Sequence, residues 1–160
     1  MEIRPARESD LVSVAAIYER EAREGPATFD TEGRSPATWR GYLESCRPGD
    51  HFLVAVDHEL LGFAYSSTYR PKPGYDTTRE TTVYVAPGAQ GRGVGSGLYA
   101  ELLPRLAEDG IHLALAGVAL PNDASRALHR AHGFEPVGVM CEVGRKLDRW
   151  VDVEWWQRRL

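Results

Sequence analysis

The chain has 160 residues, enough for one domain with a substantial hydrophobic core and too few for two domains with a full core each. Hydrophobic residues make up 42% and charged residues 26%, as in an ordinary soluble globular protein. The 19 Lys and Arg against 23 Asp and Glu leave a net charge of −4, which argues against a protein that mainly binds nucleic acid. We therefore expect one domain over residues 1–160.

Several protein classes are disfavoured by features that the sequence lacks. The two cysteines, Cys46 and Cys141, are too few for a disulfide framework and form no C-x-x-C motif for zinc or redox chemistry. No apolar run approaches the roughly 20 residues that span a bilayer. The N-terminus lacks the basic-then-apolar layout of a signal peptide. The sequence thus predicts a cytoplasmic protein with neither a membrane nor a nucleic acid as partner.

The first third of the chain predicts a short strand and two helices. Residues 2–6 alternate weakly between polar and apolar. From Leu11 to Tyr18 apolar residues recur at i, i+3, i+4 and i+7, which places them on one helical face, and Gly25-Pro26 ends this helix. A second helix is expected over 36–46, because Pro36 suits a first helical turn and Ser35 suits the cap before it.

The middle of the chain predicts three strands. Residues 51–56 and 61–69 are apolar, β-branched and aromatic, and the short turn over 57–59 joins them as an antiparallel hairpin. The Pro-rich segment 70–74 is expected to be a loop. Residues 81–85 carry the strongest strand signal of the chain, and Pro87-Gly88 ends that strand.

The second half predicts two helices and three strands. The expected elements are a helix after the glycine-rich turn 91–97 that ends at Gly110, a strand over 111–118, a helix over 122–132, and strands over about 134–143 and 149–158. The order is β-α-α-β-β-β-α-β-α-β-β. It predicts an α+β fold with one mixed sheet and helices on its faces.

The glycine-rich turn predicts an anion site. A strand ends, glycines turn the chain and a helix begins, so the first helical N–H groups and the helix dipole face one point. Glycines allow a phosphate to approach the backbone closely, and an arginine adds charge. The candidate ligand groups are Gln90, Gly91, Arg92, Gly93, Val94, Gly95 and Ser96.

Two familiar phosphate loops do not match this turn. No Gly-Lys pair exists for a P-loop of the type G-x-x-x-x-G-K-[ST]. The dinucleotide pattern G-x-G-x-x-G fails as well, because its last position is Ser96 when counted from Gly91 and Leu98 when counted from Gly93. A tight turn without a ligand is the simpler alternative, but so many glycines would weaken a helix start without any benefit.

Two motifs together resemble the GNAT superfamily of N-acetyltransferases. The spacing Gln90-x-x-Gly93-x-Gly95 after a Val-Tyr-Val strand is similar to its acetyl-CoA pyrophosphate loop. Residues 122–134 are similar to its second motif, N-x-x-A-x-x-L-Y-x-x-x-G-F. This resemblance covers nearly the whole chain. It implies acetyl-CoA as co-substrate and a GNAT-like mixed, mostly antiparallel central sheet flanked by helices.

A narrower resemblance is to the phosphinothricin and methionine sulfone or sulfoximine N-acetyltransferases. It rests on Tyr75-Asp76 and on residues 80–85, 120–123 and 149–153, together with the helix–loop region around 28–39. It implies transfer of acetyl to the amine of a small amino-acid analogue, by direct attack in a ternary complex. It also implies a homodimer.

Acetyl transfer needs a base for the amine and, where the leaving thiolate requires it, an acid. The resemblance places Glu80 as the base, acting directly or through water, whereas residue type alone favours an exposed strand-end carboxylate. His129 stands where most of the superfamily has a tyrosine that acts as general acid. A histidine there can donate a proton or orient the amine, or it can simply be packed. No carboxylate or cysteine completes a ligand set with His129 and His132, so no metal is expected.

The resemblance also implies the remaining contacts. Val83, Val85, Asn122 and Ser125 would contact the CoA arm, and a strand N–H near Val85 would meet the oxyanion. Asn122 is also a plausible helix cap.

For the acceptor, Arg70 would bind a carboxylate, with Lys72 as second choice. Phe29 and Tyr75, on loops, are candidate pocket walls, whereas Trp39 fits the core better.

Other functions stay open on the sequence. A protein N-terminal or lysine acetyltransferase would need an open groove. A non-catalytic acyl-CoA-binding module would keep the glycine loop without needing Glu80 or His129. Neither cysteine lies near the glycine loop in sequence, so a cysteine nucleophile has no support. The apolar residues of 150–156 fit an interface, a substrate wall or a strand buried on both faces.

Overall fold

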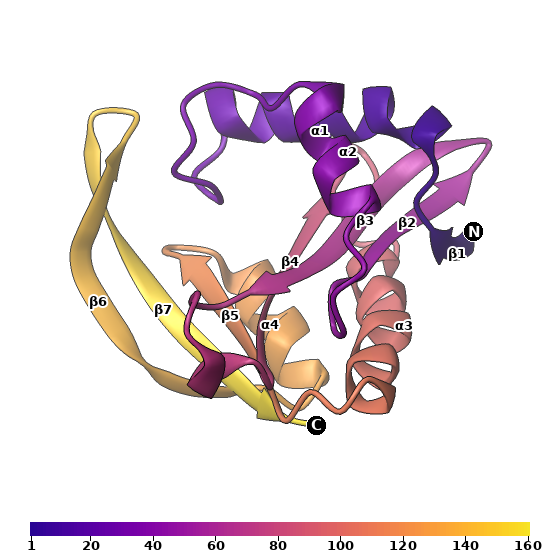
Figure 1. Ribbon diagram of the computed structural model, residues 1–160. Coiled ribbons are helices and arrows are strands. Elements are labelled where there is room, and N and C mark those ends of the chain that lie inside the picture. The colour runs from indigo at the N-terminus through magenta and orange to yellow at the C-terminus, as the bar shows by residue number, and fades with distance from the viewer.

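A computed structural model describes all 160 residues and shows one seven-stranded sheet with helices on both faces (Figure 1). The strands are β1 (Glu2–Pro5), β2 (Phe52–Asp57), β3 (Glu59–Thr68), β4 (Thr78–Val85), β5 (Leu113–Ala119), β6 (Glu135–Lys146) and β7 (Arg149–Arg159). The helices are α1 (Leu11–Glu24), α2 (Pro36–Leu43), α3 (Val94–Glu108) and α4 (Asp123–Ala131). The predicted order of elements and the α+β class are confirmed.

The sheet has the strand order β1-β2-β3-β4-β5-β7-β6. Every neighbouring pair is antiparallel except β4 and β5, which run parallel. This matches the expected mixed, mostly antiparallel sheet. The parallel pair forms in the middle of the chain, where α3 supplies the crossover that two parallel strands require.

The pairing of β4 with β5 is short, and the two strands separate where it stops. Only three residue pairs join β4 to β5, from Thr78 with Leu113 to Glu80 with Leu115. Beyond Glu80 the two strands continue without pairing, β4 to Val85 and β5 to Ala119. The backbone N–H and C=O groups on these facing edges are therefore left for partners other than a strand.

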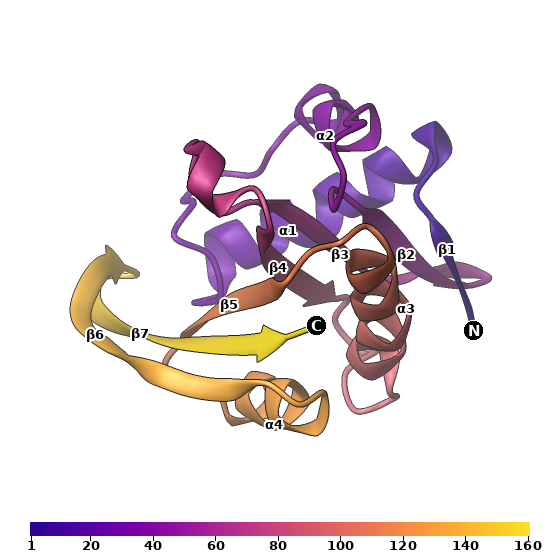
Figure 2. The same cartoon turned by 60° about the horizontal axis from the view of Figure 1, so that its bottom comes forward.

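Two hydrophobic clusters hold the layers together. The first, between the sheet and the helices α1 and α2, is rich in aromatic rings, and the fully buried Trp39 lies at its centre. The second lies beneath α3 and joins both halves of the chain, from Leu53 on β2 to Trp156 on β7. Figure 2 shows α1 and α2 above the sheet and α3 and α4 below it. Trp39 is thus a core residue, as its position on a helix predicts.

Several element boundaries differ from the sequence prediction; for example, β5 begins at Leu113 rather than at 111, and β6 continues to Lys146 rather than ending near 143. Helix α2 ends at Leu43 rather than near Cys46. Strand β4 begins at Thr78, because residues 78–80 pair with β5, so Glu80 lies inside the strand. Helix α3 begins at Val94, within the predicted turn 91–97. A Cβ at Gly97 would lie 2.6 Å from Ile3 Cδ1, so this glycine allows the first turn of α3 to pack closely on β1.

Candidate active site

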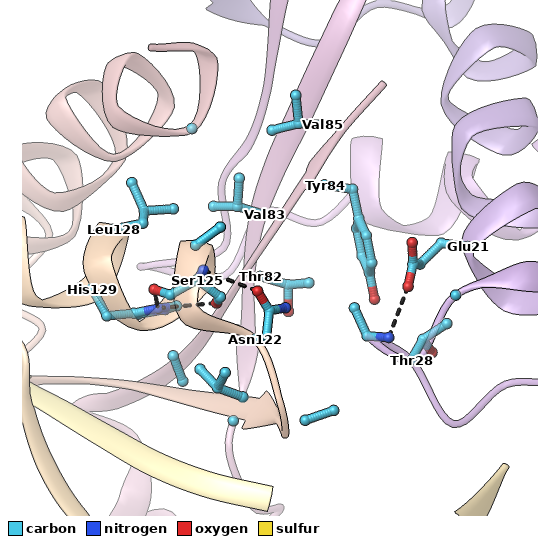
Figure 3. A pocket seen from close by; sticks show the side chains of 18 of the residues that line it. Glu21, Thr28, Thr82, Val83, Tyr84, Val85, Asn122, Ser125, Leu128 and His129 are labelled. Carbon is cyan, nitrogen blue, oxygen red and sulfur yellow. Dashed lines mark hydrogen bonds between the residues drawn. The ribbon is translucent and has the colours of Figure 1, made fainter. Parts of the chain in front are cut away.

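A cavity of about 1270 Å³ lies in the opening between β4 and β5. Its lining comes from both strands, from the N-terminus of α3, from α4 and from the loop that follows α1. Pockets for one small ligand measure about 300–1,000 Å³, so this cavity has room for two molecules side by side. In Figure 3, Asn122, Ser125 and His129 lie on one side of it, and Tyr84, Glu21 and Thr28 on the other.

The glycine turn lines one end of the cavity. Gln90, Gly91, Gly93, Val94, Gly95 and Ser96 all belong to the lining, as the phosphate-loop prediction requires. Gly93 is the residue before α3 and has φ of +79°, a backbone conformation that side chains with a Cβ rarely adopt. No side chain caps the helix there, so its first N–H groups can bind an anion.

Two residues of this turn have roles that the sequence did not predict. The Gln90 side chain accepts a hydrogen bond of 2.8 Å from the Gly88 N–H, so it braces the loop. Arg92 is about half exposed, its Nη2 lies 3.9 Å from Asp57 Oδ2, and it does not belong to the cavity lining. The anion site is therefore built from backbone N–H groups, with Arg92 at its outer edge.

The edge of β4 offers backbone hydrogen-bond groups to the cavity. The Ala86 N–H donates to the Leu61 carbonyl of β3, 2.8 Å away. In an antiparallel pair, residues that bond across alternate with residues whose polar groups face the other way. Val83 and Val85 therefore direct their N–H and C=O groups away from β3, toward β5, where pairing has already ended. Both residues line the cavity.

Asn122 and Ser125 stand at the start of α4, opposite the glycine turn. The Asn122 Oδ1 accepts a hydrogen bond of 3.0 Å from the Ser125 N–H, so Asn122 caps the helix as predicted. Both residues also line the cavity, which leaves the Asn122 amide nitrogen available to a ligand.

His129 is buried, and both of its ring nitrogens have partners within the protein. Nδ1 lies 2.7 Å from the Ser125 carbonyl oxygen, which can only accept, so Nδ1 carries the proton. In the neutral ring Nε2 then accepts from the Tyr99 hydroxyl, 2.8 Å away. Burial lowers the pKa of His129 below its usual 6.5, although the Ser125 carbonyl favours the charged form. The structure thus holds a neutral imidazole with no ring nitrogen free for a substrate.

Tyr99 and Thr81 extend this network, and neither was found from the sequence. Tyr99 is fully buried on α3, and its hydroxyl lies 3.1 Å from Thr81 Oγ1. The Thr81 hydroxyl also reaches the Leu115 carbonyl, at the last residue of β5 that pairs with β4. A phenol on the apolar face of a helix was the available signal, since a buried hydroxyl needs a partner.

Glu80 lies in the cavity lining on β4. No arginine, lysine or histidine forms an ion pair with it. Burial raises the pKa of this carboxyl because no positive charge offsets the lost hydration. A carboxylate with a raised pKa in a cavity is typical of a general base.

Only one of the three residues predicted to bind the acceptor lies in the cavity lining. Phe29 lines the cavity, whereas Arg70 and Tyr75 do not. Both pack on the Tyr69 ring, the Arg70 guanidinium 5.1 Å from its centre and the Tyr75 ring 5.4 Å from it. Tyr69 in turn lies 6.3 Å from Trp155, which is in the lining. Arg70 and Tyr75 are thus separated from the cavity by two aromatic rings, Tyr69 and Trp155.

The other candidate groups are also placed. Cys46 and Cys141 are exposed and lie outside the cavity lining. No group of three or more His, Cys, Asp or Glu side chains is arranged to hold a metal ion. No helix is both long and apolar enough to cross a membrane. Of the apolar residues of 150–156, Val151, Val153 and Trp156 are buried, Trp155 lines the cavity and Trp150 is exposed.

Comparison with known proteins decides the family. The family model described as "Acetyltransferase (GNAT) family" matches residues 14–134, most of the chain. The chain belongs to this family. It is 49% identical to the phosphinothricin N-acetyltransferase of Streptomyces coelicolor, over 100% of the chain and 96% of that protein. It is 35% identical to an L-methionine sulfoximine/L-methionine sulfone acetyltransferase of Pseudomonas aeruginosa, over 99% of the chain and 94% of that protein.

Solved structures agree with the GNAT fold. A phosphinothricin acetyltransferase of Sinorhizobium meliloti in complex with acetyl-CoA matches with a TM-score of 0.94 and 33% identity, over 99% of the chain and 88% of that protein. A structure described as ribosomal-protein-alanine N-acetyltransferase from Brucella melitensis matches with a TM-score of 0.95 and 36% identity, over the full length of both. The predicted GNAT fold and acetyltransferase class are confirmed.

Proposed function

We propose that this GNAT acetyltransferase transfers the acetyl group of acetyl-CoA to the amine of a small amino-acid analogue, such as phosphinothricin, methionine sulfoximine or methionine sulfone. The observation that carries the proposal is the cavity that is lined by the half-buried carboxylate of Glu80, which has no ion-pair partner, by the glycine turn and by the aromatic acceptor side. The named relatives at 49% and 35% identity act on these compounds.

The residues at one end of the cavity fit acetyl-CoA. The uncapped N-terminus of α3 after Gly93 suits a pyrophosphate, since it presents backbone N–H groups and a positive dipole end. The free edge at Val83 and Val85 suits the amide groups of the pantetheine arm, and the Asn122 amide faces the same space. The bound thioester supplies an activated acetyl group.

Glu80 removes the proton from the acceptor amine, directly or through one water molecule. An ammonium has no lone pair, so the amine must be neutral before it attacks. The raised pKa of Glu80 makes its carboxylate a stronger base than an exposed one. Direct attack in a ternary complex needs no acyl-enzyme, which fits the placement of both cysteines outside the cavity. The Val83 and Val85 N–H groups are the nearest preorganised donors for the oxyanion.

His129 acts as a positioning residue in this proposal. It holds the start of α4 through the Ser125 carbonyl, and its Nδ1 lies 3.3 Å from Ser125 Oγ. The Ser125 hydroxyl lines the cavity, whereas the ring nitrogens of His129 are engaged. His129 therefore fixes Ser125 at the thiol end of the site.

The acceptor carboxylate binds Arg70, with Phe29 as a wall of the cavity. Tyr75 lies outside the lining and packs on the same Tyr69 ring as Arg70, so it is not itself a wall. Arg70 is reached past Trp155, at the side of the cavity where Tyr69 stands. We also propose that the protein forms a homodimer. The outer strand β6 exposes several apolar side chains, which suit an interface between two copies in the cytoplasm. They are Val137, Val139, Met140 and Val143 on β6 and Trp150 on β7, of which Met140 and Val143 also line the cavity.

Acetylation of a peptide N-terminus is the second candidate. It is favoured by the match to the structure described as ribosomal-protein-alanine N-acetyltransferase, at 36% identity. Such an enzyme must admit a polypeptide that continues away from its reacting amine. The two candidates therefore differ in what lies beyond the acceptor end of the cavity.

Release of free thiol from acetyl-CoA tests the proposal. The acceptor panel holds phosphinothricin, methionine sulfoximine, methionine sulfone, free amino acids, polyamines and peptides that begin with alanine. The expected result is turnover with the amino-acid analogues and none with the peptides. Turnover with peptides alone would establish the second candidate. Binding of acetyl-CoA without turnover on any acceptor would indicate a non-catalytic acyl-CoA-binding module.

A further inference from the structure

The loop after α1 is tied to the far end of β6. We call residues 25–30 the strap. Lys146, the last residue of β6, is only 4% exposed. Its Nζ donates hydrogen bonds to the Glu21 carbonyl at 3.0 Å and to the Thr28 carbonyl at 2.5 Å. Lysine is almost never this deeply buried unless its charge has partners, so these two bonds hold the ammonium in place.

The partners of Lys146 suit a cation. The Glu21 carbonyl belongs to the last turn of α1, where the helix dipole is negative. It accepts from the Gly25 N–H at 2.9 Å, and its second lone pair accepts from Lys146. The Thr28 carbonyl lies within the strap itself. One ammonium thus joins the end of α1 and the strap to the tip of the β6–β7 hairpin, which is more than 100 residues away from both in the sequence.

A glycine on the same strand completes the contact. A Cβ at Gly144 would lie 2.1 Å from Phe29 Cε1, so the Phe29 ring occupies the space that any other residue would fill. The strap is held at its other side too, since the Ala27 N–H donates to Glu21 Oε1 at 2.7 Å and Tyr18 donates to Asp30 Oδ2 at 2.6 Å.

The strap forms the wall at the acceptor end of the cavity. Ala27, Thr28 and Phe29 line it, together with Gly144. Figure 3 shows Thr28 and Glu21 across the cavity from Asn122 and Ser125, which stand at the proposed CoA side. An acceptor that lies between Glu80 and Phe29 therefore meets the strap on the side away from acetyl-CoA.

We infer that Lys146 determines acceptor size: by fastening the strap to the hairpin, it closes the acceptor end to amines that continue into a polypeptide. The inference rests on the proposed function and deepens it, because it restricts the acceptor to small, free amine-bearing acids. Lys146 does not line the cavity, so it acts through Phe29 and Thr28.

The test compares Lys146→Met with Arg149→Met in the full chain. Arg149 is an exposed cation on the same hairpin, so its variant removes the same charge without touching the strap. Rates are measured with methionine sulfone and with a tripeptide that begins with methionine sulfone. We expect Lys146→Met to lower the preference in kcat/KM for the single amino acid by about 10-fold, mainly through a lower KM for the tripeptide, because the strap loses two charge-assisted bonds and no longer closes the acceptor end. The KM for acetyl-CoA stays unchanged.

A second variant distinguishes an effect of the strap on acceptor choice from a general loss of stability. Gly144→Ala keeps the Lys146 bonds and displaces only Phe29, so the preference should shift in the same direction. An unchanged preference in both variants, or a wild-type enzyme that accepts the tripeptide as well as methionine sulfone, overturns the inference.

Failure of the proposed function would look different, because methionine sulfone would then not react with the wild-type enzyme or with either variant. Hydrogen–deuterium exchange of residues 25–30 needs no activity. Faster exchange in Lys146→Met than in Arg149→Met supports the fastening of the strap, and equal exchange in the two variants overturns it.

Discussion

The two ends of the cavity are built in different ways. The proposed CoA end consists mainly of backbone groups from short segments, the β4 edge at Val83 and Val85 and the start of α3 after Gly93. The acceptor end is formed by residues that meet from distant parts of the chain, such as the Phe29 ring that packs on Gly144. The CoA end therefore depends on the backbone fold, whereas the acceptor end can be altered by single substitutions. This explains how relatives can share a cofactor site and differ in acceptor.

Glu80 is the last residue of β4 that pairs with β5, and it lines the cavity that contains both the CoA end and the acceptor end. Because Glu80 is the proposed base, its replacement has the largest expected effect. Glu80→Gln should lower kcat by about 100- to 1,000-fold, because a general base typically contributes about 10²–10⁴-fold. Acetyl-CoA affinity should not change. Because burial raises the pKa of Glu80, wild-type activity should rise with pH above the ordinary carboxyl value of 4.5, and this limb should disappear in the variant.

The same variant should be more stable at pH 7. The folded-state pKa of Glu80 exceeds its unfolded value, so its stabilising contribution is present below the unfolded pKa and is lost as pH rises through the folded pKa. Thermal unfolding checks this, with Glu59→Gln as control, since Glu59 is an exposed strand glutamate. A Glu80→Gln enzyme with wild-type kcat would remove Glu80 as the base.

Gly93→Val tests acetyl-CoA binding at the glycine turn. The side chain would occupy the phosphate approach and strain a backbone whose φ is +79°. We expect acetyl-CoA binding to weaken by about 100-fold or more, equivalent to about 2.7 kcal/mol, as measured by titration calorimetry. Gly88→Val is the matched control, because Gly88 has φ of +80° and lies outside the cavity lining. Equal losses in the two variants would mean that strain alone is responsible.

Arg70→Ala tests the acceptor end. Loss of one charge-assisted hydrogen bond should raise the KM for methionine sulfone by about 10-fold and leave the KM for acetyl-CoA unchanged. Arg47→Ala serves as control, because Arg47 is exposed and bonds only to Thr68 Oγ1. An unaltered KM in Arg70→Ala would shift the carboxylate site to an arginine of the lining, such as Arg34.

Tyr99→Phe has the smallest expected effect and probes how His129 is held. The lost hydroxyl donates to Nε2 and so stabilises the neutral ring. The pKa of His129, which burial lowers, should therefore rise in an NMR titration, with a fall in kcat of only a few-fold. Tyr42→Phe removes a hydroxyl near Arg34 instead and should leave His129 unaffected. A His129 that titrates identically in all three proteins would contradict the hydrogen-bond assignment.

The sequence predicted the glycine turn and the cap of α4 well because their signals are local. Glycine spacing, a helix start and an Asn cap all act within a few residues, so Gly93 and Asn122 could be assigned without a structure. The acceptor end escaped prediction because Lys146 and Gly144 look unremarkable in isolation. Their roles appear only once β6 is folded against the strap. Likewise, nothing within a few residues of Tyr99 indicates that its hydroxyl meets His129 on α4.

The placement of Trp155 has a spectroscopic consequence. Of the four tryptophans, Trp39 and Trp156 are sealed in the core, Trp150 faces solvent, and Trp155 alone lines the cavity, with its indole N–H directed at Met140 Sδ 3.1 Å away. A molecule that enters the cavity replaces water next to this one indole and leaves the other three as they are. The intrinsic emission of the protein therefore carries a built-in optical readout of acceptor occupancy, with no label attached.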